Sequence, residues 1–364
     1  MSSSISNIAQ QQKNDKQVAY WLIAGVIMVI IQIALGGITR LTGSGLSITE
    51  WDVITGSLPP LSHEKWVEEF AKYQQTPQFK LLNADFNLSD FKSIFFWEWF
   101  HRFWARLLGV VFAIGFVYFA VKGKFRKEMV KPFVVLFVLG ALQGAIGWVM
   151  VASGLVGDAV YVKPTRLAIH FVMALVLLAY VFWFALKLLI PASQQNNNAS
   201  ARRWIYIIAA VLLVQLAYGA LMAGHKGATA APTWPDINGN LLNPPGLYVA
   251  DHGVLNFIDN KIMVHFMHRG VAYLLIVLTV ILTLKLRATP GKSAKLLKAE
   301  KWPLLFILLQ VVLGILTVLN SKAIVPNTWG IFENLAQIHQ LIGMVFMLVL
   351  IYVFYLVKPD KVKG

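Results

Sequence analysis

The sequence predicts an all-α integral membrane protein with eight transmembrane helices, arranged as two tandem four-helix bundles. Of its 364 residues, 57% are hydrophobic and only 13% are charged, and the mean hydropathy is +0.64. Such a composition leaves too little charge to keep the surface of a soluble domain wet. Apolar runs of about 20 residues recur along the chain, and each is long enough to cross the hydrocarbon core of a bilayer. In lipid these runs must be helices, so that every backbone group is bonded internally.

Eight segments have the length and composition of a membrane-spanning helix. In chain order we expect them at residues 18–41, 95–121, 132–152, 164–190, 203–223, 261–286, 302–320 and 334–357. In the long segment between the first two, the stretch Ser62 to Gln75 is a candidate for a short helix along the outer surface. The polar N-terminus, residues 1–17, lacks the apolar stretch of a signal peptide and the arginines of a transit peptide. A bacterial inner membrane is therefore the expected location.

Basic residues are unevenly distributed among the connecting segments. They cluster after the second, fourth and sixth helices and at the C-terminus: Lys122, Lys124, Arg126, Lys127, Lys131, Lys187, Arg202, Arg203, Lys285, Arg287, Lys292, Lys295, Lys298, Lys301, Lys358, Lys361 and Lys363. Because cytoplasmic loops carry an excess of lysine and arginine, both termini are expected in the cytoplasm and loops 42–94 and 224–260 outside. The net charge of +15 therefore reflects topology, and no nucleic-acid partner is expected, since no soluble basic domain carries it.

The chain contains no cysteine. This excludes disulfides, thiolate metal sites, cysteine-ligated iron–sulfur clusters and covalent attachment of c-type haem. Any metal or haem must be held by other side chains.

The two halves of the sequence repeat each other. The matching residues are, in the first half, Gln32, Gly36, Trp51, Gly56 and Pro59-Pro60, and in the second half, Gln215, Gly219, Trp234, Gly239 and Pro244-Pro245. Each repeat contains four helices, an even number, so the two are expected to be related by an axis along the membrane normal. We therefore expect an N-terminal half at residues 1–190 and a C-terminal half at residues 200–364.

A shorter pattern lies within each half. Every odd-numbered helix carries Gln-x-x-x-Gly, at Gln32/Gly36, Gln143/Gly147, Gln215/Gly219 and Gln310/Gly314. Every even-numbered helix carries a histidine early in its run, at His101, His170, His268 and His339. With a rise of about 1.5 Å per residue, both sets are expected roughly 9–14 Å in from the outer helix ends. The sequence thus predicts one layer of four histidines and four glutamines near the outer leaflet.

The four histidines are candidate ligands of haem iron. Polar side chains are costly in hydrocarbon and usually functional there. Imidazoles from facing helices of a bundle commonly hold haem iron from both sides. We expect His101 to pair with His170 and His268 with His339. Zinc or copper sites and a purely structural role are the alternatives, and the metal sites are disfavoured because each half offers few nitrogen ligands and no thiolate.

Other polar residues lie near this layer. The Gln-x-x-x-Gly elements could serve helix packing or contact a porphyrin directly. Haem propionates could pair with arginines in the outer parts of the helices, which are Arg40, Arg102, Arg106, Arg166 and Arg269. Three further histidines, His63, His225 and His252, fall in outer loops and are expected to be solvated.

One position breaks the symmetry of the repeat. Glu98 lies one turn before His101 on the same helical face, whereas the corresponding residue before His268 is His265. A carboxylate beside one haem could exchange protons during oxidation of a substrate, which makes Glu98 a candidate catalytic residue. The alternative is an interfacial carboxylate paired with Arg102 or Arg106.

These motifs resemble those of the haem A synthase family. The resemblance rests on the run GGITRLTGSGLSITEW from Gly36 to Trp51, on Glu98-Trp99-Phe100-His101-Arg102, and on His265-Phe266-Met267-His268-Arg269-Gly270. It covers almost the whole chain, including the duplicated halves. Some members carry a cysteine pair in an outer loop, and this sequence has none, so segment 42–94 must be ordered without a disulfide.

The resemblance implies an enzyme that oxidises a methyl substituent of haem O to a formyl group, making haem A for terminal oxidases. It implies that His101 and His170 hold the substrate haem O, that Glu98 assists the chemistry, and that His268 and His339 ligate a resident haem b. Haem O synthase is a candidate protein partner, and a homo-oligomer is a candidate assembly.

Two other functions are compatible with the histidine pairs or with the internal repeat. A di-haem b electron-transfer cytochrome would need haems stacked across the membrane, whereas both histidine pairs are expected at one depth. A transporter would share the internal repeat but should have broken helices and a polar site at the membrane midplane, and neither is evident.

Overall fold

The computed structural model describes residues 2–50 and 58–357. Within them, eight helices are long and apolar enough to span a membrane, which confirms the predicted fold class. They are α1 (Ser2–Leu41), α4 (Leu88–Val121), α5 (Lys127–Ala152), α6 (Pro164–Leu189), α7 (Ala199–Gly224), α9 (Lys261–Arg287), α11 (Trp302–Leu319) and α12 (Ile331–Leu356). Five residues of the repeat and charge patterns lie outside the described residues: Trp51, Gly56, Lys358, Lys361 and Lys363.

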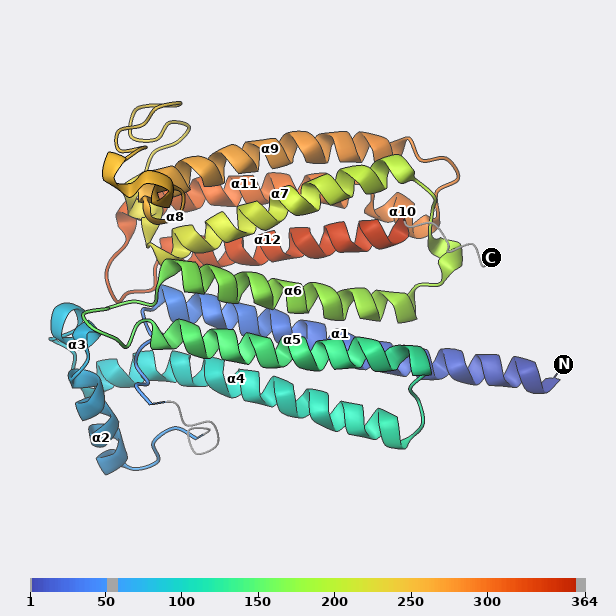
Figure 1. Cartoon of the computed structure of the whole chain (residues 1–364), viewed down its shortest axis with the longest axis horizontal. Helices are drawn as coiled ribbons and strands as arrows, with labels where there is room; N and C mark the ends of the chain where they lie inside the picture. The colour runs from blue at the N-terminus through green and yellow to red at the C-terminus, as the bar shows by residue number, and fades with distance from the viewer. Residues whose placement is uncertain (1, 51–57, 358–364) are drawn as a thin grey trace.

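The long helices run side by side, and short helices gather at the two ends of the bundle (Figure 1). At the end that we call the site end lie α2 (His63–Gln74), α3 (Pro77–Leu82), η3 (Gly227–Ala230), η4 (Ala250–Leu255), α8 (Asn256–Asp259) and η5 (Asn320–Ala323). The opposite end carries η2 (Ala192–Gln194) and α10 (Ala294–Ala299), and there α1 begins and α12 ends. The short surface helix expected within Ser62 to Gln75 is therefore present as α2.

Packing groups the long helices by fours. In the first group α1 packs on α4 and α6, and α6 packs on α5; in the second, α7 packs on α9, and α11 packs on α9 and α12. The groups meet where α6 contacts α7 and α12 and where α1 contacts α12. Side-chain amides reinforce this seam, because Gln337 and Gln340 of α12 donate to the carbonyls of Ala34 and Ile33 of α1 (both 3.0 Å). The division into halves at residues 1–190 and 200–364 stays a prediction.

Helix α4 begins earlier than the apolar run predicts, at Leu88 instead of residue 95. A capping box starts it: the Asn87 side chain accepts from Ser89 N and Asp90 N, and the Asp90 carboxylate accepts from Asn87 N. Such caps typically contribute about 0.5–2 kcal/mol. His101 consequently lies two turns deeper in its helix than expected.

The added turns of α4 support the surface helices. Phe91 is fully buried and stacks on Tyr73 of α2, with ring centroids 5.3 Å apart. The same buried cluster includes Ile94 and Phe95 of α4 and the partly buried Trp66 of α2. Aromatic packing therefore holds α2 against α4 without a disulfide.

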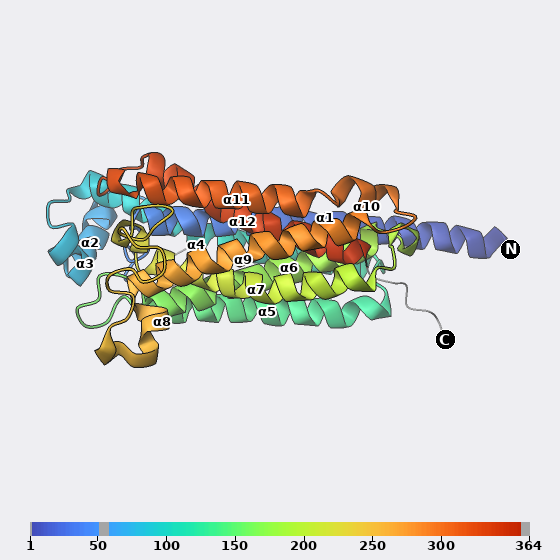
Figure 2. The same cartoon turned by 90° about the horizontal axis from the view of Figure 1, so that it is seen from above.

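Helix α1 also begins earlier than predicted, at Ser2 instead of residue 18, and it extends beyond the other helices (Figure 2). Its polar first turns contain neither glycine nor proline. Gln11 donates to Asp15 one turn on (3.0 Å), and Arg126 lies 3.3 Å from Asp15. The first is an i,i+4 contact within the helix and the second ties the helix to the loop before α5. Such contacts stabilise a polar helix, which a search for apolar runs does not detect.

Candidate functional site

One large cavity connects the two halves. It encloses about 1370 Å³, more than the roughly 300–1,000 Å³ of a usual ligand pocket. Its lining includes all four expected histidines, His101, His170, His268 and His339. The cavity is thus large enough for more than one sizeable ligand, and the predicted ligands face it from both halves.

In the C-terminal half, His268 of α9 and His339 of α12 face each other. Their ring centroids are 6.4 Å apart, with an angle of 73° between the ring planes. Imidazole nitrogen–metal bonds are about 2 Å long, which places the two ring centroids of a bis-histidine iron on the order of 6 Å apart. The spacing of this pair therefore fits an iron atom between the rings.

The tautomer of His339 also suits metal binding. Its Nδ1 lies 3.0 Å from the backbone carbonyl of Gln310, and since a carbonyl only accepts, Nδ1 carries the proton. Nε2 then carries the lone pair, as is typical of metal-binding histidines. It faces the side-chain amide of Gln310 (3.3 Å), and a bound metal would replace that contact.

In the N-terminal half, His101 of α4 and His170 of α6 line the same cavity. Among the described residues, no ring contact like that of His268 and His339 joins them. The N-terminal pair is therefore brought to one cavity but held more openly than the C-terminal pair.

Each histidine is held by the Gln-x-x-x-Gly element of a neighbouring helix. Each glutamine places its side-chain Nε2 beside one histidine. Gln32 donates to the backbone carbonyl of His101 (3.2 Å). The other three face a ring nitrogen: Gln143 faces His170 Nδ1 (3.2 Å), Gln215 faces His268 Nε2 (3.3 Å) and Gln310 faces His339 Nε2 (3.3 Å). The glycines leave room for the imidazole rings. A Cβ added at each glycine would meet the nearest ring atom at 3.3 Å (Gly36 and His101), 2.8 Å (Gly147 and His170), 3.3 Å (Gly219 and His268) or 2.9 Å (Gly314 and His339). The motif therefore packs against the histidines in all four helices, and its direct contact with haem stays a prediction.

The glutamines leave an unused acceptor at each position. The Oε1 atoms of Gln32, Gln143, Gln215 and Gln310 are buried, and none accepts a hydrogen bond within the described part of the chain. A buried, unpaired polar atom is destabilising, so such atoms commonly mark a ligand or an ordered water. Together with the paired imidazoles and the glycines beside them, these atoms fit two flat porphyrins. Among the described residues, no three histidine, aspartate, glutamate or cysteine side chains gather into a group that could hold a bare metal ion.

Glu98 lines the cavity, but it is also tied into the loop after α1. Its Oε2 accepts from Ser47 Oγ (2.7 Å) and from the backbone N of Ile48 (2.9 Å), and its Oε1 accepts from Arg102 (2.6 Å). Arg102 in turn donates to the carbonyl of Ile48 (3.3 Å). Pairing with Arg102 was one of the two expectations for Glu98, and Ser47 is a contact that the sequence analysis missed.

His265 occupies the corresponding place in the C-terminal half. It is fully buried, it donates from Nε2 to the carbonyl of Gly227 (2.8 Å), and its Nδ1 lies 3.4 Å from Arg269. Arg269 donates to the carbonyls of Ala231 and Thr233. Glu98 and His265 thus both link an arginine one turn later to the outer loop. Of these two positions only Glu98 is a carboxylate, and the C-terminal half contributes a carboxylate to the cavity from another place, Glu333 of α12.

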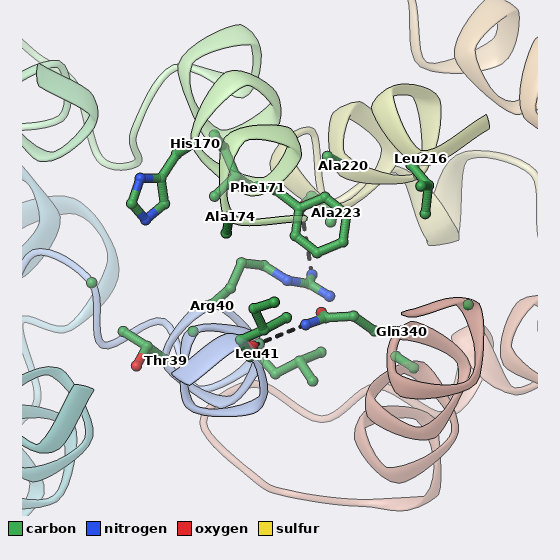
Figure 3. A pocket seen from close by; sticks show the side chains of 18 of the residues that line it. Thr39, Arg40, Leu41, His170, Phe171, Ala174, Leu216, Ala220, Ala223 and Gln340 are labelled. Atoms are coloured by element: carbon green, nitrogen blue, oxygen red, sulfur yellow. Dashed lines mark hydrogen bonds between the residues drawn. The ribbon is translucent and has the colours of Figure 1, made fainter. Parts of the chain in front are cut away.

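Arg40 extends from α1 into the space bordered by α6, α7 and α12 (Figure 3). Its guanidinium lies 3.5 Å from the carbonyl of Ala223, at the junction of the two halves. Lys226, which the sequence analysis missed, lines the cavity close by, with its ammonium 3.6 Å from the centre of the Tyr161 ring. Desolvation and the charge of Arg40 lower the pKa of Lys226 to about 8. Two basic groups therefore lie near the junction of the halves, and the carboxylate of Glu333, which also lines the cavity, offsets part of the charge of Arg40.

The remaining candidates are placed differently. Arg106 lines the cavity, whereas Arg166 donates to the carbonyl of Val149 (2.9 Å) and is not among the lining residues. His63 and His252 are exposed, as expected. His225 is partly buried with Nε2 2.7 Å from the carbonyl of Ile258, so the expectation that it is solvated was wrong.

Comparison with known proteins identifies the family. Residues 19–351 match the model of the family described as cytochrome oxidase assembly protein. A heme A synthase of Flavobacterium psychrophilum is 37% identical over 350 residues, which cover 94% of this chain and 98% of the relative. A heme A synthase of a Methylobacterium species is 43% identical over 305 residues, which cover 82% of this chain and 83% of the relative. That of Bradyrhizobium diazoefficiens is 39% identical over 322 residues, which cover 88% of each. The chain therefore belongs to the haem A synthase family of cytochrome oxidase assembly proteins.

Proposed function

We infer that this chain is a haem A synthase, a membrane oxidoreductase that converts haem O to haem A by oxidising a porphyrin methyl group to formyl. The observation that carries this conclusion is the single cavity lined by two histidine pairs, in a chain whose relatives bear that name. The resemblance seen in the sequence and the family match agree. The alternative of a di-haem electron-transfer cytochrome is not favoured.

We further propose that the two halves have different roles. His101 and His170 would hold the substrate haem O, and His268 and His339 would hold a resident haem b. Two observations support this division. The C-terminal pair already has the spacing of a bis-histidine site. In the N-terminal half a carboxylate, Glu98, lines the cavity one turn before the first histidine, where the C-terminal half has His265. A resident haem b would supply a route for electrons released from the substrate.

Glu98 is the proposed catalytic residue. Oxidising a methyl group to formyl releases protons as well as electrons, and a carboxylate near the ring can accept them. Each carboxylate oxygen has two lone pairs, and Oε1 accepts a bond from Arg102 with one of them, so it can accept another from the cavity side. Ser47, Ile48 and Arg102 hold the carboxylate in a fixed position.

We propose the cytoplasmic membrane of a bacterium as the location, with the site end outside. The loops joining α4 to α5 and α9 to α11 lie at the opposite end of the bundle and carry Lys122, Lys124, Arg126, Lys292 and Lys301. Arg202 and Arg203 stand near the start of α7 at the same end. Haem O synthase remains our candidate partner, since it would deliver a poorly soluble substrate within the same membrane, and a homo-oligomer our candidate assembly.

The test is expression in a host that makes haem O but no haem A, followed by haem extraction and chromatography. Haem A should appear with the wild-type chain and be absent without it. Haem b at two sites per chain, with haem O left unconverted, would instead identify an electron-transfer cytochrome.

A further inference from the structure

The two halves differ in how their second and third long helices pack. In the C-terminal half α9 and α11 pack against each other, whereas the corresponding helices α4 and α5 approach at hardly any point along their backbones. α4 is held by α1, and α5 is held by α6. The N-terminal bundle is therefore open on one side, between α4 and α5.

Glycines line this opening. Gly109 of α4 and Gly140 and Gly144 of α5 are exposed, and all three line the cavity that holds the histidines. A side-chain carbon added at any of them would meet no atom within 4 Å. We call this region, lined by Gly109, Gly140 and Gly144, the α4–α5 opening. It joins the space around His101 and His170 to the lipid-facing surface.

The C-terminal half has bulky residues at the same three positions. Aligning His101 with His268 places Ile276 opposite Gly109, and aligning Gln143 with Gln310 places Ile307 and Val311 opposite Gly140 and Gly144. Ile307 is only 2% exposed and belongs to the same buried core as Leu275 and Leu278 of α9. The side chains that close the C-terminal bundle are therefore missing from the N-terminal bundle.

The opening does not extend along the whole length of the helices. Towards the opposite end, Phe137 of α5 contacts Phe112 and Phe116 of α4, with ring centroids 4.9 and 5.4 Å apart. These rings fill the space between the two helices below the glycines. The opening thus lies between the level of the histidines and these rings: Gly144 is one turn from Gly147, whose Cβ position faces His170, and Gly109 is two turns past His101.

We propose that the α4–α5 opening binds the isoprenoid chain of haem O and admits the substrate sideways from the membrane. This inference rests on the proposed function and adds a specificity site to it. Haem O differs from haem b by a hydroxyethylfarnesyl chain in place of a vinyl group. That long, branched hydrocarbon needs an apolar path beside the porphyrin, and its natural surroundings are lipid.

The polar start of the chain has a partner at the same place. Gln143 stands between Gly140 and Gly144, and its buried Oε1 accepts no hydrogen bond in the described structure. The hydroxyl of the hydroxyethylfarnesyl group can donate to such an acceptor. The glutamine is repeated in the other half as Gln310, but there Ile307 and Val311 close the path that a chain would follow.

This arrangement explains why each half would select a different haem. The N-terminal site has room for a porphyrin with a long chain, and the C-terminal site has room only for one without it. The distinction comes from three side chains on the helices and not from the iron ligands, which are histidines in both halves.

The experiment transfers the bulky residues of the C-terminal half into the opening. The full-length protein carrying its resident haem is titrated with haem O and with iron protoporphyrin IX, which lacks the chain, and the second haem bound per chain is followed by absorbance. The variants are Gly140→Ile with Gly144→Val, and the single changes Gly109→Ile, Gly140→Ile and Gly144→Val. Ala145→Val is the matched control, because Ala145 is an exposed small residue of α5 that does not line the cavity.

The wild type and the control should bind haem O more tightly than the chainless porphyrin, by about tenfold or more, which corresponds to about 1.4 kcal/mol. The variants should lose that preference while still binding the chainless porphyrin and keeping the resident haem. If every variant that keeps its resident haem also keeps the wild-type preference, or if Ala145→Val loses it equally, the proposal is wrong. The single changes ensure that a poorly folded double variant does not decide the question.

The same proteins separate this inference from the proposed reaction. A wild type that prefers haem O but yields no haem A in cells would contradict the reaction and leave the chain-binding site standing. Haem A formed normally by a variant that also keeps the full haem O preference would contradict the site and leave the reaction standing.

Discussion

Glu98 and His265 occupy the same place in the two halves but differ in chemistry. Both contact an arginine one turn later, so both help to anchor the outer loop. A purely structural role would need only a hydrogen-bond acceptor at this position, which His265 provides. A carboxylate beside the N-terminal histidine pair therefore indicates a further role, acceptance of protons from the substrate.

Replacing Glu98 with glutamine tests that role. Gln keeps the shape and can still accept from Ser47 and Ile48, so the fold and the haem b of the C-terminal half should survive. Conversion of haem O to haem A should fall by about 10²–10⁴-fold, as expected on loss of a general base. Haems extracted from cells making the variant are separated by chromatography, and resident haem b is counted beside them. An undiminished yield of haem A would leave Glu98 as an ion-pair partner only.

The resident haem is expected to depend on His268 and His339. Their rings already stand at the spacing of a bis-histidine iron, so removing either imidazole removes one axial ligand. We predict that His268→Ala and His339→Ala each abolish the six-coordinate, low-spin haem b spectrum of the purified protein. His252→Ala is the control, because His252 is an exposed loop residue. A full low-spin spectrum in both variants would show that the assignment is wrong.

Lys226 should make porphyrin binding depend on pH. Its pKa is lowered to about 8, so its ammonium is present at pH 7 and is lost as the pH rises through 8. The carboxylates of a porphyrin are anionic throughout this range, and their attraction to the cavity should weaken between pH 7 and 9. Lys226 is partly exposed, so the change should be only severalfold. Titration of the wild type and of Lys226→Gln across this range measures it: the variant should bind more weakly at pH 7 and show no step near pH 8. An identical step in both would assign the titration to another group.

Helix packing around each histidine depends on the glycine of the Gln-x-x-x-Gly element. A Cβ at Gly314 would lie 2.9 Å from Cε1 of His339, closer than ordinary contact, so α11 and α12 can approach only with glycine there. The same relation holds in the other three pairs, which explains why the motif recurs once per odd-numbered transmembrane helix.

Gly314→Ala should therefore weaken haem b binding although alanine favours the helix by about 1 kcal/mol. The added methyl displaces the His339 ring from the position that faces His268. Gly270→Ala on α9 is the matched control, because a Cβ there meets nothing within 4 Å. Haem content per purified chain should fall and haem should be lost at a lower temperature in the first variant, and both should stay unchanged in the second. Equal haem retention in both would mean that the ring has room to move.

The orientation of the whole protein follows from its charge. The site end carries the surface helices and loops of mixed charge, and the opposite end carries the lysine- and arginine-rich connections. We therefore predict that both termini are cytoplasmic. A phosphatase reporter, active only in the periplasm, fused after Lys363 should be inactive, and the same reporter inserted in segment 224–260 should be active. The reverse pattern would invert the topology.

Much of this protein is predictable from its sequence. The eight helices, the duplicated halves, the four histidines and the surface helix α2 all follow from local patterns, because apolar run length and residue spacing along a helix are properties of neighbouring residues. The helix starts were less predictable: α1 and α4 extend into polar residues that a hydropathy pattern does not count, and side-chain caps and i,i+4 contacts stabilise those turns.

Tertiary structure decided the contacts between segments far apart in sequence. The bond from Ser47 to Glu98, the position of Arg40 and Lys226 between the halves, and the separation of α4 from α5 depend on how whole helices pack. Gly109, Gly140 and Gly144 are compatible with tight packing or with an opening, and the sequence does not distinguish the two. Which one forms depends on whether a neighbouring helix comes close enough to fill the space, and that distance is set by the packing of every other helix in the bundle.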